Sequence, residues 1–140
     1  MIIRQARGQG YDLQLVSGDG LYTEQFWLVA GPASEGARFT SPPDPRNKPE
    51  AAGVVRRFRS GHYEPEGGTL HTYASIQVWA QAAEKAGTVK PAAAIEALRT
   101  HEFDTVLGRI GFDSNGDVTG SPTYIWYVWK HGQYVPAPPD

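Results

Sequence analysis

The sequence predicts an α/β protein that closes with antiparallel strands, and three observations carry this expectation. Residues 12–16 alternate as a short strand, and a Gly-rich turn separates them from a helical pattern over residues 24–30, which is the order of one α/β unit. Two further helical patterns cover residues 69–86 and 91–99. After residue 105 the chain carries strand and hairpin signals. This order is typical of a chain that leaves one lobe, enters another and returns.

The composition indicates an ordinary globular domain and excludes several classes of site. The 140 residues include 13 Lys and Arg against 15 Asp and Glu, a net charge of −2, so no broad nucleic-acid-binding surface is expected. Without any Cys, the chain has no disulfides, thiol catalysis or Cys-ligated metals. No apolar run approaches the roughly 20 residues that span a bilayer. The N-terminus shows no secretory signal pattern of basic, apolar and small residues.

Capping signals place the elements of the first half of the chain. Thr23 stands where the 24–30 helix needs an N-cap, and a second short strand is expected over residues 37–40. Asn47 and Glu50 have the spacing of a capping box, which predicts that the next helix begins there. The apolar residues predicted to share the buried face of that helix are Ala51, Val54, Val55 and Phe58.

The 69–86 pattern is the longest helix signal, and Gly87 suits its C-terminal cap. Spacings of three and four predict one inward stripe on this helix. The stripe comprises Tyr73, Ile76, Ala80 and Ala83. The 91–99 helix is expected to turn another three residues inward, which are Ala94, Ile95 and Leu98.

Strands and turns are expected in the last third of the chain. Residues 106–112 are strand-like, and the Asp113–Asp117 segment contains Asn-Gly, a strong hairpin signal. Residues 124–129 are apolar at every position, which predicts a strand buried on both faces. His131-Gly132 then turns the chain into a short last strand over residues 133–135.

Motifs for metal binding and catalysis are absent from the sequence. The four His residues have no ligand spacing, so neither a metal nor another cofactor is expected. Asp113–Asp117 resembles the start of a calcium loop, but Val118 and Tyr124 stand where such a loop needs Gly and Glu. No Gly-x-Ser-x-Gly, Ser-x-x-Lys or paired-carboxylate motif is present. We therefore expect a binding protein and not an enzyme.

Asp19 is the strongest candidate for a binding residue. It follows a predicted strand, where open α/β sheets bind their ligands, and Gly18 and Gly20 on either side allow a ligand close to the backbone. The alternative is that the Asp19 carboxylate caps the next helix. Tyr73 is also open to two interpretations, because a phenol on an inward helical stripe is either core or part of a site.

Several short motifs, in one order along the chain, resemble a known family. They are Ile3-Arg4-Gln5-Ala6-Arg7, Gly18-Asp19-Gly20-Leu21, Ala30-Gly31-Pro32-Ala33, Glu35-Gly36, Pro43-Asp44-Pro45-Arg46, Thr72-Tyr73-Ala74-Ser75-Ile76-Gln77-Val78-Trp79, Phe103-Asp104-Thr105-Val106-Leu107-Gly108, Ile110-Gly111-Phe112-Asp113 and Gly116-Asp117. The chain resembles the branched-chain amino-acid substrate-binding proteins of ABC transporters. The likeness covers essentially all of this chain and only the C-terminal part of such a protein.

The resemblance implies a C-terminal fragment of the two-lobe type I periplasmic-binding fold, with a returning antiparallel strand segment. Residues 1–67 would be an α/β portion of the second lobe. Residues 68–104 would be a helical segment that crosses to the first lobe. Residues 105–140 would pass back through the hinge as returning strands of the second lobe.

The resemblance also implies function and site residues. Asp19 matches the acidic position that receives the α-ammonium of the ligand, where Leu/Ile/Val-specific members tend to carry Glu. Tyr73 matches a tyrosine that lines the cleft, and Gly18 and Gly20 would shape the backbone at the carboxylate. The family captures an amino acid, branched-chain or similar, in the periplasm and delivers it to an ABC permease complex. The alternative function is an amino-acid or amide sensor of the same fold.

The resemblance carries one further expectation, which concerns self-association. Helix faces that would pack on an absent first lobe stay exposed in this chain, above all the stripe of Tyr73, Ile76, Ala80 and Ala83. Because exposed apolar patches tend to find partners, we expect a homo-oligomer, for which exchange of the helical segment is one route.

Overall fold

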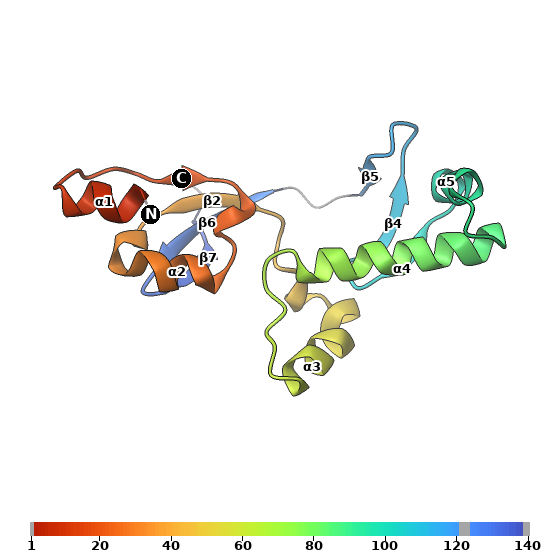
Figure 1. Ribbon diagram of the computed structural model, residues 1–140, viewed down its shortest axis with the longest axis horizontal. Helices are drawn as coiled ribbons and strands as arrows, with labels where there is room; N and C mark the ends of the chain where they lie inside the picture. The colour runs from red at the N-terminus through yellow and green to blue at the C-terminus, as the bar shows by residue number, and fades with distance from the viewer. Residues whose placement is uncertain (1, 121–123, 139–140) are drawn as a thin grey trace. The chain divides into compact units, whose positions relative to one another are not determined.

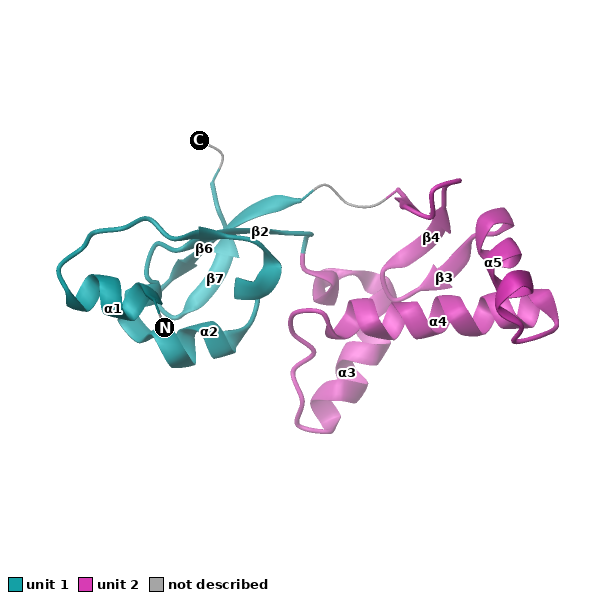
Figure 2. Cartoon of the chain, turned by 45° about the horizontal axis from the view of Figure 1, so that its top comes forward, with its two compact units in different colours: residues 1–43, 123–140 teal, residues 44–122 magenta. Residues whose placement is uncertain are grey.

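The computed structural model describes residues 2–120 and 124–138. The chain forms two compact units, of which unit 1 comprises residues 1–43 and 123–140 and unit 2 comprises residues 44–122 (Figure 2). These units divide the chain at other positions than the segments expected from the resemblance, whose assignment to lobes stays a prediction. Figure 1 labels the elements that are described below, one unit at a time.

Unit 1 is a mixed four-stranded sheet in the order β1-β2-β6-β7. β1 (Val16–Ser17) is parallel to β2 (Arg38–Ser41), which pairs antiparallel with β6 (Ile125–Lys130), and β6 pairs antiparallel with β7 (Gln133–Pro136). The expected α/β start and returning antiparallel strands are thus confirmed. The first strand is shorter than residues 12–16 suggested, since β1 pairs with β2 through two residues only.

Local signals place the helix and the turn of unit 1 where the sequence predicts them. α1 (Ile2–Gly8) opens the chain, and α2 (Glu24–Ala30) begins after Thr23, whose hydroxyl accepts a hydrogen bond from the Gln25 N–H. Between β6 and β7, His131 and Gly132 both have positive φ, 50° and 80°. Two such residues make the tight turn that suits a right-twisted hairpin.

Aromatic side chains fill the core of unit 1. Phe39 of β2 and Tyr127 of β6 stack with ring centroids 5.3 Å apart, and Trp129 is 1% exposed against Phe26 of α2. β6 is only partly buried on its second face, because Trp126 is 48% exposed while Val128 is buried. The prediction of a strand buried on both faces therefore holds only for Tyr127, Val128 and Trp129.

Unit 2 consists of helices packed on a small antiparallel sheet. Its helices are α3 (Ala52–Ser60), α4 (Thr69–Ala86) and α5 (Pro91–Thr100), which match the predicted helices apart from the start of α3. Its strands are β3 (Phe103–Thr105), β4 (Gly108–Phe112) and β5 (Val118–Thr119), paired in chain order. The turn before β5 is the predicted hairpin, in which one Asp113 carboxylate oxygen accepts the N–H groups of Asn115 and Asp117.

The predicted capping box before α3 is wrong. Two 3₁₀ turns, η3 (Pro45–Asn47) and η4 (Pro49–Ala51), occupy this segment, and the Asp44 carboxylate caps the first of them by accepting the Arg46 N–H at 2.9 Å. Lys48 precedes a proline and is extended, with φ −79° and ψ 138°. Since a residue before proline avoids the helical region, a continuous helix cannot start at Asn47 and begins at Ala52.

The inward stripe predicted for α4 is also wrong. The buried face consists of Leu70, Ala74, Val78 and Ala82. Tyr73 and Ile76 are instead 38% and 63% exposed. Apolar residues lie on both sides of α4, and the side that has partners is the one buried: Leu70 and Ala74 pack against α3, and Val78 and Ala82 pack against Ala97 of α5 and Phe103 of β3.

On α5 the buried residues are Ala94 and Ala97, while Ile95, which was expected inward, is 48% exposed. Leu98 is partly buried beside the cluster of Val78 and Phe103. Alanine rather than isoleucine faces α4 because α5 packs on the C-terminal half of α4, where Ala97 meets Val78 and Ala82 (Figure 1). Small side chains let such helices approach closely.

The strand predicted over residues 106–112 is confirmed as β4 from Gly108 onward, whereas Val106 and Leu107 form the turn of a hairpin between β3 and β4. Two glutamines of α4 then close the free edge of β3. Gln77 Oε1 accepts the Val106 N–H at 2.9 Å, and the Gln81 amide binds the backbone N–H and C=O of Asp104 at 3.2 and 2.8 Å. The helix thus supplies the hydrogen bonds that a neighbouring strand would make. Within the described residues, no helix has both the length and the apolarity to cross a membrane.

Candidate functional site

Asp19 lies in a 3₁₀ turn at the C-terminal end of β1. β1 ends at Ser17, and η1 (Asp19–Leu21) follows, closed by the Tyr22 N–H donating to the Asp19 carbonyl at 2.9 Å. The carboxylate is exposed, and within the described residues it has no hydrogen bond or ion pair. Because Thr23 caps α2, Asp19 does not serve as the cap of that helix. The carboxylate is therefore available to a ligand.

The core of unit 1 supports the backbone of this turn. The Trp129 indole N–H donates to the Leu21 carbonyl at 3.2 Å. The next residue, Tyr22, is 4% exposed and packs on Tyr134 and Tyr127 with ring centroids 4.7 and 5.4 Å away. A rigid support of this kind fixes the position of Asp19 without occupying its carboxylate.

Gly18 and Gly20 leave open space beside Asp19. Apart from the adjoining residues, no atom lies within 4 Å of the place where either glycine would carry a Cβ, and Gly18 has an ordinary φ of −93°. Neither backbone strain nor internal crowding therefore requires glycine at position 18. What the missing side chains provide is access for another molecule to the peptide groups on both sides of the carboxylate.

Tyr73 is on α4 in unit 2, whereas Asp19 belongs to unit 1. It is not a core residue, because it is 38% exposed. Its ring meets Phe58 of α3 edge to face, with centroids 6.3 Å apart, and Phe58 in turn contacts Tyr63 at 5.6 Å. Tyr73 thus lies at the edge of an aromatic cluster. The periodicity of the sequence did not reveal this cluster, because its members come from α3, α4 and the loop between them.

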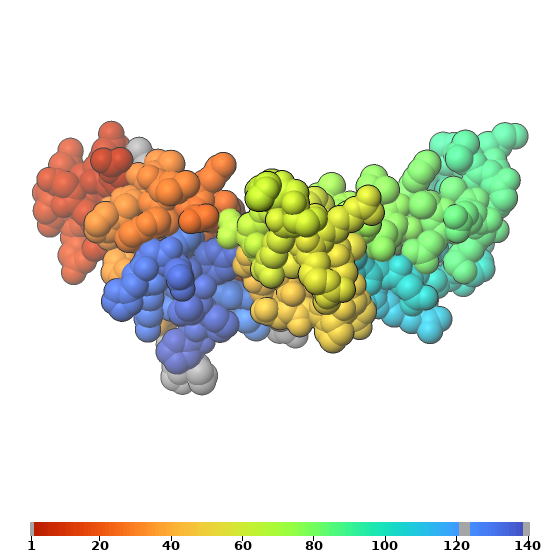
Figure 3. Space-filling model, turned by 90° about the horizontal axis from the view of Figure 1, so that it is seen from below, coloured from red at the N-terminus to blue at the C-terminus, as the bar shows by residue number. Residues whose placement is uncertain are grey.

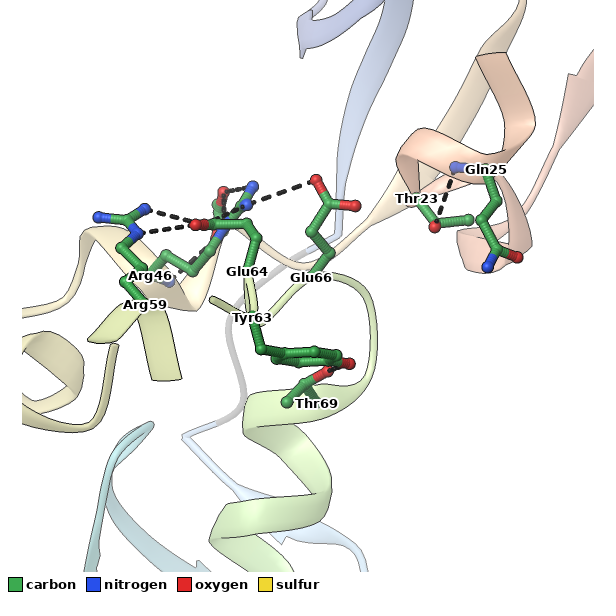
Figure 4. A network of polar contacts seen from close by, with 9 residues as sticks. Thr23, Gln25, Arg46, Arg59, Tyr63, Glu64, Glu66 and Thr69 are labelled. Carbon is green, nitrogen blue, oxygen red and sulfur yellow. Dashed lines mark hydrogen bonds and ion pairs between the residues drawn. The ribbon is translucent and has the colours of Figure 1, made fainter. Parts of the chain in front are cut away.

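An ion-pair network holds the loop that carries Tyr63 (Figure 4). The Glu64 carboxylate accepts two hydrogen bonds from Arg59, at 2.7 and 2.8 Å, and one from Arg46 at 2.9 Å. Arg46 also binds the carboxylate of Asp44 at 2.6 Å and lies 3.6 Å from Glu66. Tyr63 itself shares a hydrogen bond with the Thr69 hydroxyl at 3.2 Å. These contacts tie the loop to η3, to the C-terminal turn of α3 and to the start of α4.

The network makes the stability of unit 2 sensitive to acid. Hydrogen bonds from Arg59, with a further contribution from Arg46, lower the pKa of Glu64 to about 2 from 4.5. A carboxylate with a lowered folded-state pKa stabilises the fold above its unfolded pKa, and this contribution is lost as the pH falls from about 4.5 towards 2. The stability difference between the wild type and Glu64→Gln is therefore expected to shrink over this range, as measured by thermal unfolding.

The matched control for this prediction is Glu84→Gln, which changes an exposed carboxylate on α4 of the same unit. The stability difference between this variant and the wild type should be small at every pH. It should not change with pH as the difference for Glu64→Gln does. A difference for Glu64→Gln that stays constant between pH 5 and pH 2 would contradict the role of the ion pairs.

No metal site is evident in the part of the chain that the structure describes, where no three His, Asp or Glu side chains gather closely enough to hold an ion. The Asp113 loop, which resembled a calcium loop, uses its first carboxylate for backbone N–H groups of its own turn.

Comparison with known families identifies the chain. A model of the periplasmic binding protein family matches residues 1–133. The chain belongs to this family. Its relatives include the Leu/Ile/Val-binding protein homolog 1 of Brucella suis, 43% identical over 133 residues, and an amino acid binding protein of Pseudomonas aeruginosa, 40% identical over 140 residues. These matches cover 94% and 98% of this chain but only 36% and 37% of the relatives.

Solved periplasmic binding proteins share the fold. A leucine binding protein of Thermotoga maritima superposes with a TM-score of 0.81 at 28% identity, over 98% of this chain and 40% of that protein. A branched-chain amino acid substrate-binding protein of Streptococcus pneumoniae, solved with isoleucine, superposes with a TM-score of 0.76 at 24% identity, over 97% of this chain and 41% of that protein. The resemblance drawn from the short motifs is thereby confirmed, as is the type I periplasmic-binding fold.

Proposed function

We propose that this periplasmic binding protein chain supplies one part of an amino-acid site in the substrate-binding component of an ABC importer. The ligand, a branched-chain or similar amino acid, is held between two lobes in the periplasm and passed to a permease complex, without chemical change. The names of the Brucella and Pseudomonas relatives, which refer to Leu/Ile/Val or amino acid binding, support this class of ligand.

The unpaired Asp19 carboxylate carries the proposal. An ammonium group that leaves water needs a negative partner and hydrogen-bond acceptors, and Asp19 offers both at the end of β1. Gly18 and Gly20 leave the neighbouring peptide groups accessible to the same ligand. Tyr73 is proposed to contact the side chain of the ligand through its exposed ring, which Phe58 supports from behind.

The 140-residue chain alone is expected to bind leucine, isoleucine and valine weakly, with a Kd above the micromolar range. One exposed charge pair contributes roughly 0–1 kcal/mol, whereas micromolar affinity requires about 8 kcal/mol. Isothermal titration calorimetry measures this directly. Micromolar binding by the chain alone would contradict the idea that the site needs a second lobe.

The proposal itself is tested with a chimera. The 133 matching residues of the Brucella suis relative are replaced by those of this chain, so that the remaining 64% of the relative supplies the rest of the protein. We expect the chimera to bind at least one of leucine, isoleucine and valine, as the unchanged relative does in a parallel titration. A folded chimera that binds none of them, beside a relative that binds, would reject the proposal.

A further inference from the structure

Unit 2 contains a hollow of about 490 Å³ beside α3. Residues of α3, of the loop after it and of the first turns of α4 line the hollow, among them Arg57, Phe58, Tyr63, Thr69 and Tyr73. Figure 3 views the molecule from the side on which α3, in yellow, stands in front of α4, in green. Ligand pockets measure about 300–1,000 Å³, so the volume of this hollow suits a small organic molecule.

The aromatic rings of the hollow support one another. Phe58 meets Tyr63 and Tyr73 with ring centroids 5.6 and 6.3 Å away. The Tyr63 hydroxyl shares a hydrogen bond with the Thr69 hydroxyl at 3.2 Å, and Figure 4 shows this ring beside the first turn of α4. Tyr63 and Tyr73 are nevertheless 53% and 38% exposed, so part of each ring is open to a ligand. Such walls favour a flat aromatic body, which can stack on a ring or meet it edge to face.

Arg57 adds a positive charge to this hollow. It is exposed, and its guanidinium makes no ion pair or hydrogen bond within the part of the chain that the structure describes. The positions three and four residues away on α3, where a helix places partners, hold neither Asp nor Glu. The Glu64 carboxylate of the next loop is already bound by Arg59 and Arg46. Arg57 is therefore available to an anion, and a guanidinium can bind a carboxylate through two parallel N–H groups.

We propose that this hollow binds an aromatic carboxylate, with the carboxylate on Arg57 and the ring against Tyr63 and Tyr73. The site goes beyond the proposed amino-acid site, because every residue that lines it belongs to unit 2 and Asp19 is not among them. Of the stripe on α4 that the resemblance expects to pack on a first lobe, only Tyr73 lines this hollow. Another hollow of unit 2, of about 310 Å³ beside Trp79, has no Arg or Lys in its lining and so lacks a permanent cation for a carboxylate.

Titration of the 140-residue chain with phenylacetate, followed by amide chemical shifts in NMR spectra, tests the proposal. We expect a Kd in the millimolar range, with the shifts centred on Arg57, Tyr63 and Tyr73. Phenylacetamide keeps the ring and the size but lacks the charge. It should bind about fivefold more weakly, a modest factor because the charge pair is exposed to water. Acetate, which lacks the ring, should cause no shifts at these residues.

Two pairs of variants separate the charge from the ring. Arg57→Gln should weaken phenylacetate binding about fivefold and remove the preference over phenylacetamide. Arg56→Gln is the matched control and should leave the Kd unchanged, because Arg56 is also exposed on α3 but does not line the hollow. Tyr73→Leu should weaken the binding of both ring compounds. Trp79→Leu, at another exposed aromatic residue of α4, should not.

The proposal is overturned if phenylacetate causes no shifts at the hollow or binds no better than phenylacetamide. It is also overturned by equal effects of the two Arg variants or by shifts centred on Trp79. Both Arg positions are exposed, so these variants should keep the circular dichroism and thermal midpoint of the wild type. The measurements use neither the chimera nor Asp19, so failure of this site and failure of the amino-acid site are distinguishable.

Discussion

Asp19→Asn in the chimera with the Brucella suis relative is expected to weaken amino-acid binding more than 100-fold. Removal of one partner from an enclosed charge pair costs about 3–5 kcal/mol, because the other charge stays buried without compensation. Asparagine keeps the size of the side chain and removes only the charge. Calorimetric titration with leucine, isoleucine and valine measures the loss.

The same variant should hardly change the stability of the ligand-free protein. In the described part of the chain the Asp19 carboxylate has no hydrogen bond or ion pair, so its neutralisation removes no contact of the fold. The thermal midpoint without ligand is therefore expected to equal that of the parent chimera. This separates a role in binding from a role in folding.

Asp12→Asn is the matched control. Asp12 is also an exposed aspartate of unit 1, with a side chain 99% exposed and 3.4 Å from Arg7, and exposed pairs contribute about 0–1 kcal/mol. It should leave binding unchanged. Undiminished binding by Asp19→Asn, or an equal loss in both variants, would remove Asp19 from its assigned role as the partner of the ammonium.

Short-range signals predicted the elements whose ends are set by their own residues. Thr23 caps α2, Gly87 ends α4 in the left-handed region, and the Asp113 carboxylate organises its hairpin. In each case the deciding hydrogen bond or dihedral angle lies within a few residues. The predicted start of α3 was wrong for a reason that is also local. The proline at position 49 excludes the helix that the Asn47–Glu50 spacing favours.

Long-range contacts decide which apolar residues are buried where the periodicity of the sequence allows more than one choice. α4 has apolar residues on both sides, and only the positions of α3, α5 and β3 determine that Ala74 is buried and Ile76 is exposed. The hairpin at Val106 and Leu107 is likewise closed by Gln77, a helical residue 29 positions earlier. Neither contact can be predicted from the residues nearby in the sequence.

The candidate site was likewise predictable from nearby residues only in part. The position of Asp19 after a strand and between two glycines was visible in the sequence, and the structure confirms that it follows β1. Its support was not visible, because Trp129 bonds to Leu21 across 108 residues. The aromatic neighbours of Tyr73 also come from separate elements.

Trp129→Ala is expected to destabilise unit 1 by about 3–5 kcal/mol, the usual cost of removing a buried Trp or Phe side chain. Trp129 is 1% exposed, contacts Phe26 and Tyr134 with ring centroids 5.4 and 5.3 Å away, and donates its indole N–H to the turn that carries Asp19. Urea unfolding of the 140-residue chain measures the loss.

Two further variants separate packing from the hydrogen bond. Trp126→Ala, on the same strand but at a residue 48% exposed, should cost much less, and an equal loss would contradict the assignment of Trp129 to the core. Trp129→Phe keeps most of the ring and removes the donor to Leu21, so it should lose about 0.5–1.5 kcal/mol beyond the smaller packing change. Because that hydrogen bond positions the turn of Asp19, the Phe variant should also weaken amino-acid binding by the chimera, whereas Trp126→Ala should not.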